Sequence, residues 1–328
     1  MKKIVMLCLS AGIQKTISFE CFAPGEVNRS KTYRYDASGK AVNSARVLTQ
    51  LAQAEPEPRE KTDVSVICPL GERNKDFFLS MASSDGLNVR SVIIPGFTRE
   101  CCTLIDEANQ LVTELVVEEP VPEGDSAQFE EKLMECLRAE LGLDGGEKAD
   151  ALLFAGSRPK FWSAGIIKRI AATAKENGIL FMADFRGNDL LSILGEYTPD
   201  IIKINEDEFW ATFGTTKKLP ATFGASSAAS AANNEERLFA AIAEKSRQLN
   251  NIIVVTRGKE RTLAATRGTK QSVQTERVKA VNTIGCGDAY NAGFLYEYIK
   301  TKDVQKALEK GKWCASRNAE NIRPGVIC

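Results

Sequence analysis

The second half of the chain alternates apolar runs with amphipathic stretches, and this alternation constrains the fold more than any other feature. The runs at 151–154 and 180–183 are short and wholly apolar, whereas residues 164–177 repeat apolar side chains with a helical period. Buried parallel strands have continuous apolar sequences and need long crossover connections. The alternation therefore predicts βαβ units that build a mostly parallel sheet with helices on both faces. In this half we expect strands at 151–154, 180–183, 200–204 and 251–256, and helices at 164–177, 190–197, 206–213 and 235–249.

The first half of the chain is less regular and predicts a smaller group of strands beside the main sheet. We expect the segments at about 14–35 and 92–117 to form a small β lid, because each holds short strands separated by turn residues. The alanine- and serine-rich stretch at about 219–234 is predicted to be an inserted surface loop. The alternation continues past it, so residues 1–328 are expected to form a single domain. Further expected elements are strands at 4–9 and 63–68 and helices at 75–83 and 126–141.

Composition narrows the classes of function. Lysine plus arginine and aspartate plus glutamate each number 43, which argues against nucleic acid or an anionic membrane as a partner. No apolar run is long enough to span a bilayer. The absence of histidine excludes Ser-His-Asp catalysis and histidine-ligated zinc. The 9 cysteines include no C-x-x-C pair, so we expect no zinc cage or disulfide framework and a cytoplasmic location.

A glycine-rich turn, Gly285-Cys286-Gly287-Asp288, opens the last apolar helical pattern. Such a turn points several backbone N–H groups at one spot, which suits an anion. The carboxylate of Asp288 stands beside that spot and could accept a proton from an attacking hydroxyl. Alternatively, Asp288 merely complements the helix dipole. Neither G-x-x-x-x-G-K-[ST] nor G-x-G-x-x-G occurs, so the other common phosphate-binding loops lack support.

This turn resembles the C-terminal G-x-G-D motif of the PfkB carbohydrate kinases, the ribokinase-like family. The N-terminal motif of that family is similar to Gly39-Lys40-Ala41-Val42-Asn43 and the residues that follow. The resemblance implies an α/β ribokinase-like fold, a mostly parallel central sheet sandwiched by helices with a small β lid. Further stretches match the phosphosugar branch, which holds 1-phosphofructokinase and tagatose-6-phosphate kinase, in order and spacing over nearly the whole chain: 24–29, 98–99, 113–115, 155–157 with Pro159, and 202–205 with Glu208.

The resemblance implies an ATP-dependent kinase that phosphorylates a sugar hydroxyl with the help of Mg²⁺. Asp288 matches the catalytic base, and the amides of Gly285, Cys286 and Gly287 would face the charge developing on the transferred phosphoryl group. Asn205 and Glu208 match the motif that holds the Mg²⁺–phosphate network, through water and phosphate. Their spacing alone also fits a helix N-cap and its capping-box partner. The remaining matches to nucleotide-binding positions are Lys203, Thr256 and Gly258.

On the acceptor side, the resemblance implies a ketohexose phosphate, such as fructose 1-phosphate, fructose 6-phosphate or tagatose 6-phosphate. Three cations are expected to bind the substrate phosphate, since cations on separate loops can converge on it: Lys40, Arg29 and Arg99. Each could instead be a solvated surface charge. The positions that match sugar-holding residues are Gly39, Lys40 and Asn43, and Ser157 could add a hydroxyl donor. Family members often dimerise through their lids, so we also expect a homodimer.

Two departures from the family pattern concern the sugar. The family has aspartate where this chain has Gln14, which offers one carbonyl acceptor and an NH₂ donor in place of a carboxylate. The family also has glycine at the positions of Ser38 and Ala41, and these two added side chains narrow the approach of the backbone to the sugar. Two alternatives therefore stay open: a kinase of an unphosphorylated sugar or nucleoside, and a catalytically silent relative that senses nucleotide or sugar phosphate.

Overall fold

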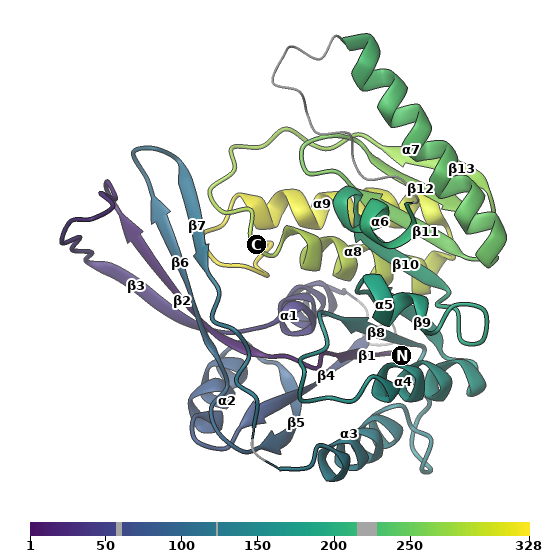
Figure 1. The fold of residues 1–328 in the computed structure, drawn as a ribbon, viewed down its shortest axis with the longest axis horizontal. Helices are drawn as coiled ribbons and strands as arrows, with labels where there is room; N and C mark the ends of the chain where they lie inside the picture. The colour runs from purple at the N-terminus through teal and green to yellow at the C-terminus, as the bar shows by residue number, and fades with distance from the viewer. Residues whose placement is uncertain (57–60, 123, 215–227) are drawn as a thin grey trace.

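A large, mostly parallel sheet runs through the centre of the molecule (Figure 1). The computed structural model describes residues 1–56, 61–122, 124–214 and 228–328, with the backbone alone for 228–232. Within these residues the strands are β1 (Lys2–Leu7), β4 (Thr62–Gly71), β5 (Asn88–Ile94), β8 (Ala151–Ala155), β9 (Leu180–Asp184), β10 (Ile201–Asn205), β11 (Ile252–Thr256), β12 (Thr262–Thr266) and β13 (Thr269–Val273). Their order across the sheet is β13-β12-β11-β10-β9-β8-β1-β4-β5. The strands from β11 to β5 are parallel, and β12 and β13 add antiparallel pairs at one edge.

The central strand β1 shows why its sequence is continuously apolar. Successive side chains of a strand point to opposite faces of the sheet. Ile4 and Met6 belong to the hydrophobic core on one face, and Val5 and Leu7 belong to the core on the other. All four are fully buried, so a polar residue at any of them would enter one core or the other.

Helices cover both faces of the large sheet, as the alternation predicted. Helix α4 (Gly165–Glu176) illustrates the cause, because Ile166, Ile170 and Ala174 recur at the helical period and are all buried. One core is shared with α1 (Lys40–Gln53), α2 (Lys75–Ser84), α8 (Cys286–Thr301) and α9 (Val304–Ala319). The other is shared with α3 (Ala127–Glu140), α4, α5 (Gly187–Leu191), α6 (Glu206–Phe213) and α7 (Ala228–Leu249). The predicted fold class is confirmed.

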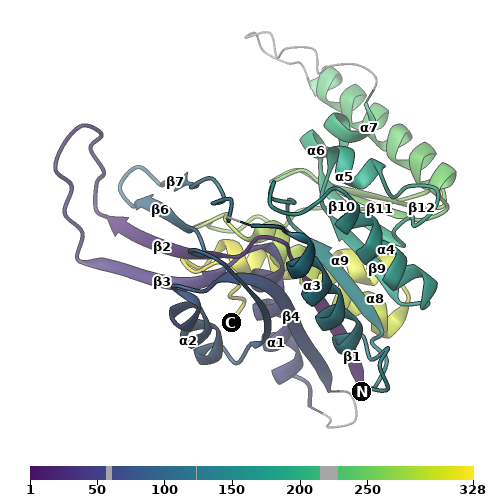
Figure 2. The same cartoon turned by 60° about the horizontal axis from the view of Figure 1, so that its bottom comes forward.

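A second, four-stranded sheet projects from the body beside α1 and α2 (Figures 1 and 2). It holds β2 (Gly12–Phe19), β3 (Thr32–Ser38), β6 (Glu100–Asp106) and β7 (Leu111–Leu115), in the order β3-β2-β6-β7. Residues 92–94, which we expected in the lid, belong instead to β5 of the large sheet. There Val92 pairs with Pro69 and is buried, because β5 adds to the exposed edge of β4.

Some elements differ from the sequence-based expectations. The helix expected at 190–197 is shorter and earlier: α5 ends at Leu191, after which Ile193 and Leu194 bond to carbonyls three residues back. The left-handed φ of +91° at Gly195 prevents a helix from continuing through that residue. The hairpin of β12 and β13 was missed; its turn places Arg267 and Gly268 at positive φ, and Arg-Gly is not a usual turn signal. Helix α9 was also missed.

Residues 219–227 of the expected insertion lie outside the described residues, whereas 228–234 belong to α7. Among the described helices, none combines the length and apolar character that a membrane span requires.

Candidate active site

A cavity lies at the carboxyl ends of the parallel strands, where the small sheet meets the large one. The strand order reverses between β1 and β8, and ligands of open α/β sheets bind outside the carboxyl ends at such a point. The cavity has a volume of about 450 Å³. Its lining comes from β2, the turn before α1, the small sheet, the ends of β9, β10 and β11, and the start of α8: Gly12, Gln14, Ser38, Gly39, Lys40, Asn43, Arg99, Cys101, Glu114, Val116, Asp184, Lys203, Asn205, Glu208, Thr256, Ile284, Gly285, Gly287 and Asp288.

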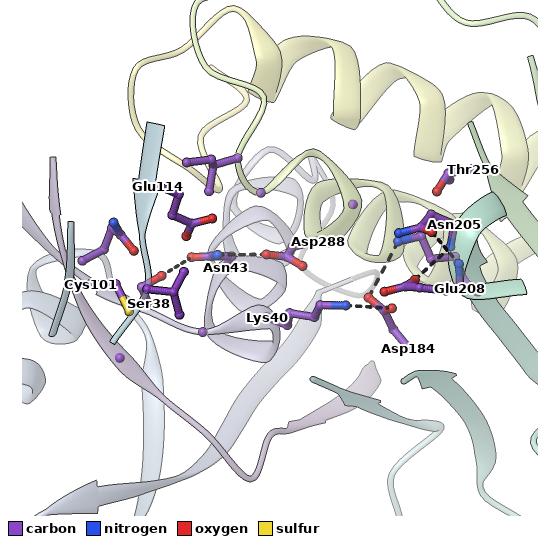
Figure 3. Close-up of a pocket in the computed structure, with 18 of the residues that line it drawn as sticks. Ser38, Lys40, Asn43, Cys101, Glu114, Asp184, Asn205, Glu208, Thr256 and Asp288 are labelled. Atoms are coloured by element: carbon purple, nitrogen blue, oxygen red, sulfur yellow. Dashed lines mark hydrogen bonds and ion pairs between the residues drawn. The ribbon is translucent and has the colours of Figure 1, made fainter. Parts of the chain in front are cut away.

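Asp288 lies between the two ends of this cavity (Figure 3). Glu114 and Cys101, from the small sheet, line one end. Asn205 and Thr256, at the ends of β10 and β11, line the other. A ligand that fills the cavity would therefore extend past Asp288 on both sides.

The carboxyl group of Asp288 is buried, being 7% exposed, and is held from α1. Asn43 Nδ2 donates to Asp288 Oδ2 at 2.9 Å, and Ser44 Oγ donates to the backbone carbonyl oxygen of Asp288 at 2.9 Å. Burial raises the pKa of Asp288 to about 6, although Lys40 and Asn43 oppose the rise. A carboxyl with this pKa is mostly ionised at neutral pH and is still basic enough to accept a proton.

The first turn of α8 presents backbone N–H groups beside Asp288. Gly285 has a φ of +79°, and a Cβ there would lie 2.9 Å from Pro324 Cβ, so a side chain does not fit. No side chain caps the first turn of α8, and a Cβ on Gly287 would lie 3.0 Å from Lys203 Nζ. The first N–H groups of a helix have no partner within the helix, so they and the Lys203 ammonium together form a site for an anion.

Asp184 ends β9 and was missed by the sequence analysis. Its carboxylate accepts from Asn291 Nδ2 at 2.6 Å, lies 3.2 Å from Lys40 Nζ and lies 3.7 Å from Lys203 Nζ. Burial alone would raise the pKa of Asp184, but Lys203 and Lys40 outweigh it and hold the pKa below its ordinary value. The signal in the sequence was an acidic residue immediately after the apolar run 180–183, at the edge where ligands bind.

Asn205 and Glu208 form the capping box of α6. Asn205 Oδ1 accepts from the Glu208 backbone N–H at 2.8 Å, and Glu208 Oε2 accepts from the Asn205 backbone N–H at 3.0 Å. The cap expected from their spacing is therefore present. Both residues also line the cavity. Within the described part of the chain, no group of three or more cysteine or acidic side chains is placed to hold a metal ion.

The structure does not bring the three expected phosphate-binding cations together. Lys40 turns to Asp184, and Arg99 Nε lies 3.0 Å from Glu119 Oε2. Arg29 is exposed on the segment between β2 and β3 and does not line the cavity, because the hairpin carries it away from the pocket. Two other expected binding residues, Ser157 and Gly258, are likewise exposed and outside the lining.

Two further expected residues have contacts that the sequence could not show. Gln14 lines the end of the cavity that the small sheet forms and is buried, and its Nε2 donates to Thr103 Oγ1 of β6 at 2.8 Å. Cys286 does not line the cavity; Asn318 Nδ2 lies 3.4 Å from its Sγ. The backbone N–H of Cys286 also donates to the carbonyl oxygen of Thr283 at 3.3 Å, so the expected contact of this amide with the phosphoryl group is not supported, and Gly285 and Gly287 line the pocket in its place.

We expect the pH dependence of kcat/KM to report Asp288. Because burial raises its pKa to about 6, activity should fall to half its plateau near pH 6 and continue to fall in more acidic solution. Activity falls toward acidic pH, and not toward alkaline pH, because a general base works only when it is deprotonated. The measurement is a pH profile at limiting acceptor concentration. A half-maximum near the ordinary aspartate value of about 4 would contradict the raised pKa of Asp288.

Comparison with known proteins places this cavity in context. Residues 8–324 match the model of the pfkB family carbohydrate kinase. Tagatose-6-phosphate kinase of Staphylococcus epidermidis is 24% identical over 326 residues, which are 99% of this chain and 94% of the relative. The structure of phosphofructokinase-2 from Escherichia coli with fructose-6-phosphate is 18% identical, with a TM-score of 0.79 over 97% of this chain and 94% of that one. A possible 1-phosphofructokinase from Thermotoga maritima is 19% identical, with a TM-score of 0.79 over 98% and 93% of the two chains.

Proposed function

We propose that this chain, which belongs to the pfkB family of carbohydrate kinases, phosphorylates a ketohexose phosphate at the expense of ATP. Family membership makes the protein a phosphotransferase with ATP as donor and an alcohol group as acceptor. The observation that carries the proposal is the buried carboxylate of Asp288 beside the open first turn of α8. The relatives named for tagatose 6-phosphate and fructose-6-phosphate make these sugars, with fructose 1-phosphate, the first candidates.

In the proposed reaction, the hydroxyl oxygen of the acceptor attacks the γ-phosphorus of ATP while Asp288 accepts the proton of that hydroxyl. The new P–O bond forms while the bond to ADP breaks, and the proton remains on the Asp288 carboxyl until the products leave. The N–H groups of Gly287 and Asp288 and the ammonium of Lys203 face the negative charge of the transferring group. Asn43 keeps the base oriented through its hydrogen bond to Oδ2.

The residues at the other end of the cavity, where Asn205 and Thr256 lie and where we place the nucleotide, are compatible with Mg²⁺ held through water. Asn205 and Glu208 supply an amide and a carboxylate, which are oxygen ligands suited to magnesium, but their capping contacts already fix them in place. The described residues offer no cage of direct ligands, and Mg²⁺ commonly keeps several waters and binds substrate phosphates. Bound there, the ion would neutralise charge on the ATP phosphates.

The test of the proposed function is an ATP-consumption screen over fructose 1-phosphate, fructose 6-phosphate, tagatose 6-phosphate and the free sugars. We expect turnover with at least one of the phosphates. The ion pairs that already engage Lys40 and Arg99 favour one alternative, a kinase of an unphosphorylated sugar, and turnover confined to free sugars would establish it. Nucleotide binding without turnover on any acceptor would support a silent sensor instead.

The residue most directly linked to the choice of acceptor is Gln14. Gln14→Asp should raise kcat/KM for the phosphorylated acceptor about tenfold, because a hydrogen bond to a charged acceptor contributes roughly 1.5–3 kcal/mol. Thr103 Oγ1, which now accepts from Gln14, can rotate to donate to the carboxylate. Gln248→Asp, an exposed change on α7, is the matched control. Slower turnover in Gln14→Asp would show that the amide is adapted to this chain's own acceptor.

We also propose that the protein is a cytoplasmic homodimer that pairs through the small sheet. Tyr33, Leu111 and Leu115 of that sheet are 66%, 60% and 51% exposed. Exposed apolar side chains along open sheet edges favour pairing with a second copy. All 9 cysteines are free thiols, which is compatible with a reducing compartment.

A further inference from the structure

The end of the cavity that the small sheet lines is called the acceptor end, because the proposed sugar-binding residues Gln14 and Asn43 lie there. The segment between β7 and α3 passes this end and inserts one carboxylate there. Residues 116–118, 120 and 121 are exposed, whereas Glu119 is half-buried. Glu119 Oε2 accepts from Ser10 Oγ at 2.5 Å and lies 3.0 Å from Arg99 Nε. Ser10 belongs to the segment between β1 and β2, so three segments that are distant in sequence meet at this carboxylate.

This contact lies at the acceptor end of the cavity. Arg99 lines the cavity, and a Cβ on Gly12 would lie 3.9 Å from Arg99 Nε. A Cβ on Gly39 of the sugar turn would lie 3.2 Å from the backbone oxygen of Ser10. Glu119 therefore engages the cation that faces the acceptor, a few atoms from the turn that the family uses for sugar.

Arg99 and Glu119 satisfy each other poorly. Arg99 Nε is buried, and despite its short distance to Glu119 it has no partner with hydrogen-bond geometry. The other described contact of the guanidinium, from NH1 to the carbonyl oxygen of Val117, is long at 3.5 Å. Burial raises the pKa of Glu119, and the contacts with Ser10 and Arg99 do not fully offset it. The guanidinium therefore has a buried Nε without a well-directed acceptor, and the carboxylate bears a desolvation cost. A better-placed anion can displace such a carboxylate from the guanidinium.

We propose that Glu119 competes with the phosphate group of the acceptor for Arg99, and so determines the affinity for phosphorylated acceptors. A phosphate group offers three acceptor oxygens and more negative charge, and it pairs bidentately with a guanidinium. When such an acceptor binds, the Glu119 carboxylate leaves Arg99 and moves toward solvent with the exposed segment that carries it. This inference rests on the proposed function, because it concerns an acceptor that already bears a phosphate.

The test is the kinetic effect of Glu119→Gln, with Glu118→Gln as the matched control. Glu118 is the adjacent residue, and its side chain is 89% exposed. Removing the competing charge should lower the KM for the phosphorylated acceptor about tenfold, the factor expected from losing one charge-assisted contact. The kcat should stay within about twofold, because Glu119 does not touch the reacting atoms. Glu118→Gln should change neither constant.

Ser10→Ala provides a second variant that keeps the charge of Glu119. It removes the hydroxyl that holds the carboxylate at Arg99, so KM should fall in the same direction by a smaller factor. Thermal unfolding of each variant shows whether the fold is retained. A folded Glu119→Gln protein with an unchanged or higher KM would overturn the proposal, because Glu119 would then be a support that holds Arg99 in place.

A binding measurement separates this inference from the proposed function. Calorimetric titration with inorganic phosphate and with fructose 6-phosphate, without ATP, measures the anion site directly. Tighter phosphate binding by Glu119→Gln than by the unchanged protein, even without turnover of any phosphosugar, would support the competition while rejecting the proposed acceptor class. Equal binding by the two proteins would reject the competition whatever the turnover.

Discussion

Replacing Asp288 with asparagine is expected to lower kcat by about 10²–10⁴-fold, the usual contribution of a positioned general base. Asparagine retains the size of the side chain and can still bond to Asn43, but it cannot accept the proton of the acceptor hydroxyl. The affinity for ATP should change little, because the N–H groups of the first turn of α8 and the ammonium of Lys203 remain. Steady-state kinetics and a nucleotide titration measure the two effects.

The control for this variant tests the alternative role of Asp288 in the helix dipole. Asp76 also lies in the first turn of a helix, α2, and its side chain is 87% exposed. Asp76→Asn removes the same charge from the first turn of another helix and should leave kcat unchanged. Full activity in Asp288→Asn would exclude it as the base and leave the dipole interpretation.

The second large effect is expected on stability, from Asp184→Asn. The change leaves two ammonium groups, those of Lys40 and the buried Lys203, without the nearest counter-charge that they share. Removing one partner from a buried charged network costs about 3–5 kcal/mol. Asparagine has nearly the same shape as aspartate and can keep a contact with Asn291. The loss of stability therefore reports the missing charge of the Asp184 side chain. The measurement is urea unfolding, in which the midpoint should fall while the dependence of the unfolding free energy on urea concentration stays the same.

Asp144→Asn is the matched control for this prediction. Asp144 pairs with Arg138 at 3.0 Å, and the two side chains are 50% and 49% exposed. Exposed pairs contribute about 0–1 kcal/mol, so this variant should unfold almost as the unchanged protein does. A loss in Asp184→Asn as small as in the control would show that solvent or a rearranged Lys203 replaces the carboxylate.

The sequence predicted those features that depend on neighbours along the chain. Buried parallel strands need apolar side chains on both faces, so Ile4, Val5, Met6 and Leu7 form one unbroken run that can be recognised without a structure. The turn at Gly285 and the helix after it follow from local backbone requirements in the same way. Where local signals were weak, as at Arg267-Gly268, the prediction failed.

The electrostatics of the cavity were decided by tertiary structure. Lys40 and Asp184 are 144 residues apart, Asn43 and Asp288 are 245 apart, and Ser10 and Glu119 are 109 apart. Sequence patterns could name Lys40 as a cation near the sugar, but they could not show that a carboxylate at the end of β9 already engages it. The sequence by itself thus determined the sheet, the glycine turn and the family. Only the packing of distant strand ends decided which charges meet, because an ion pair depends on distance in space and not on spacing in the chain.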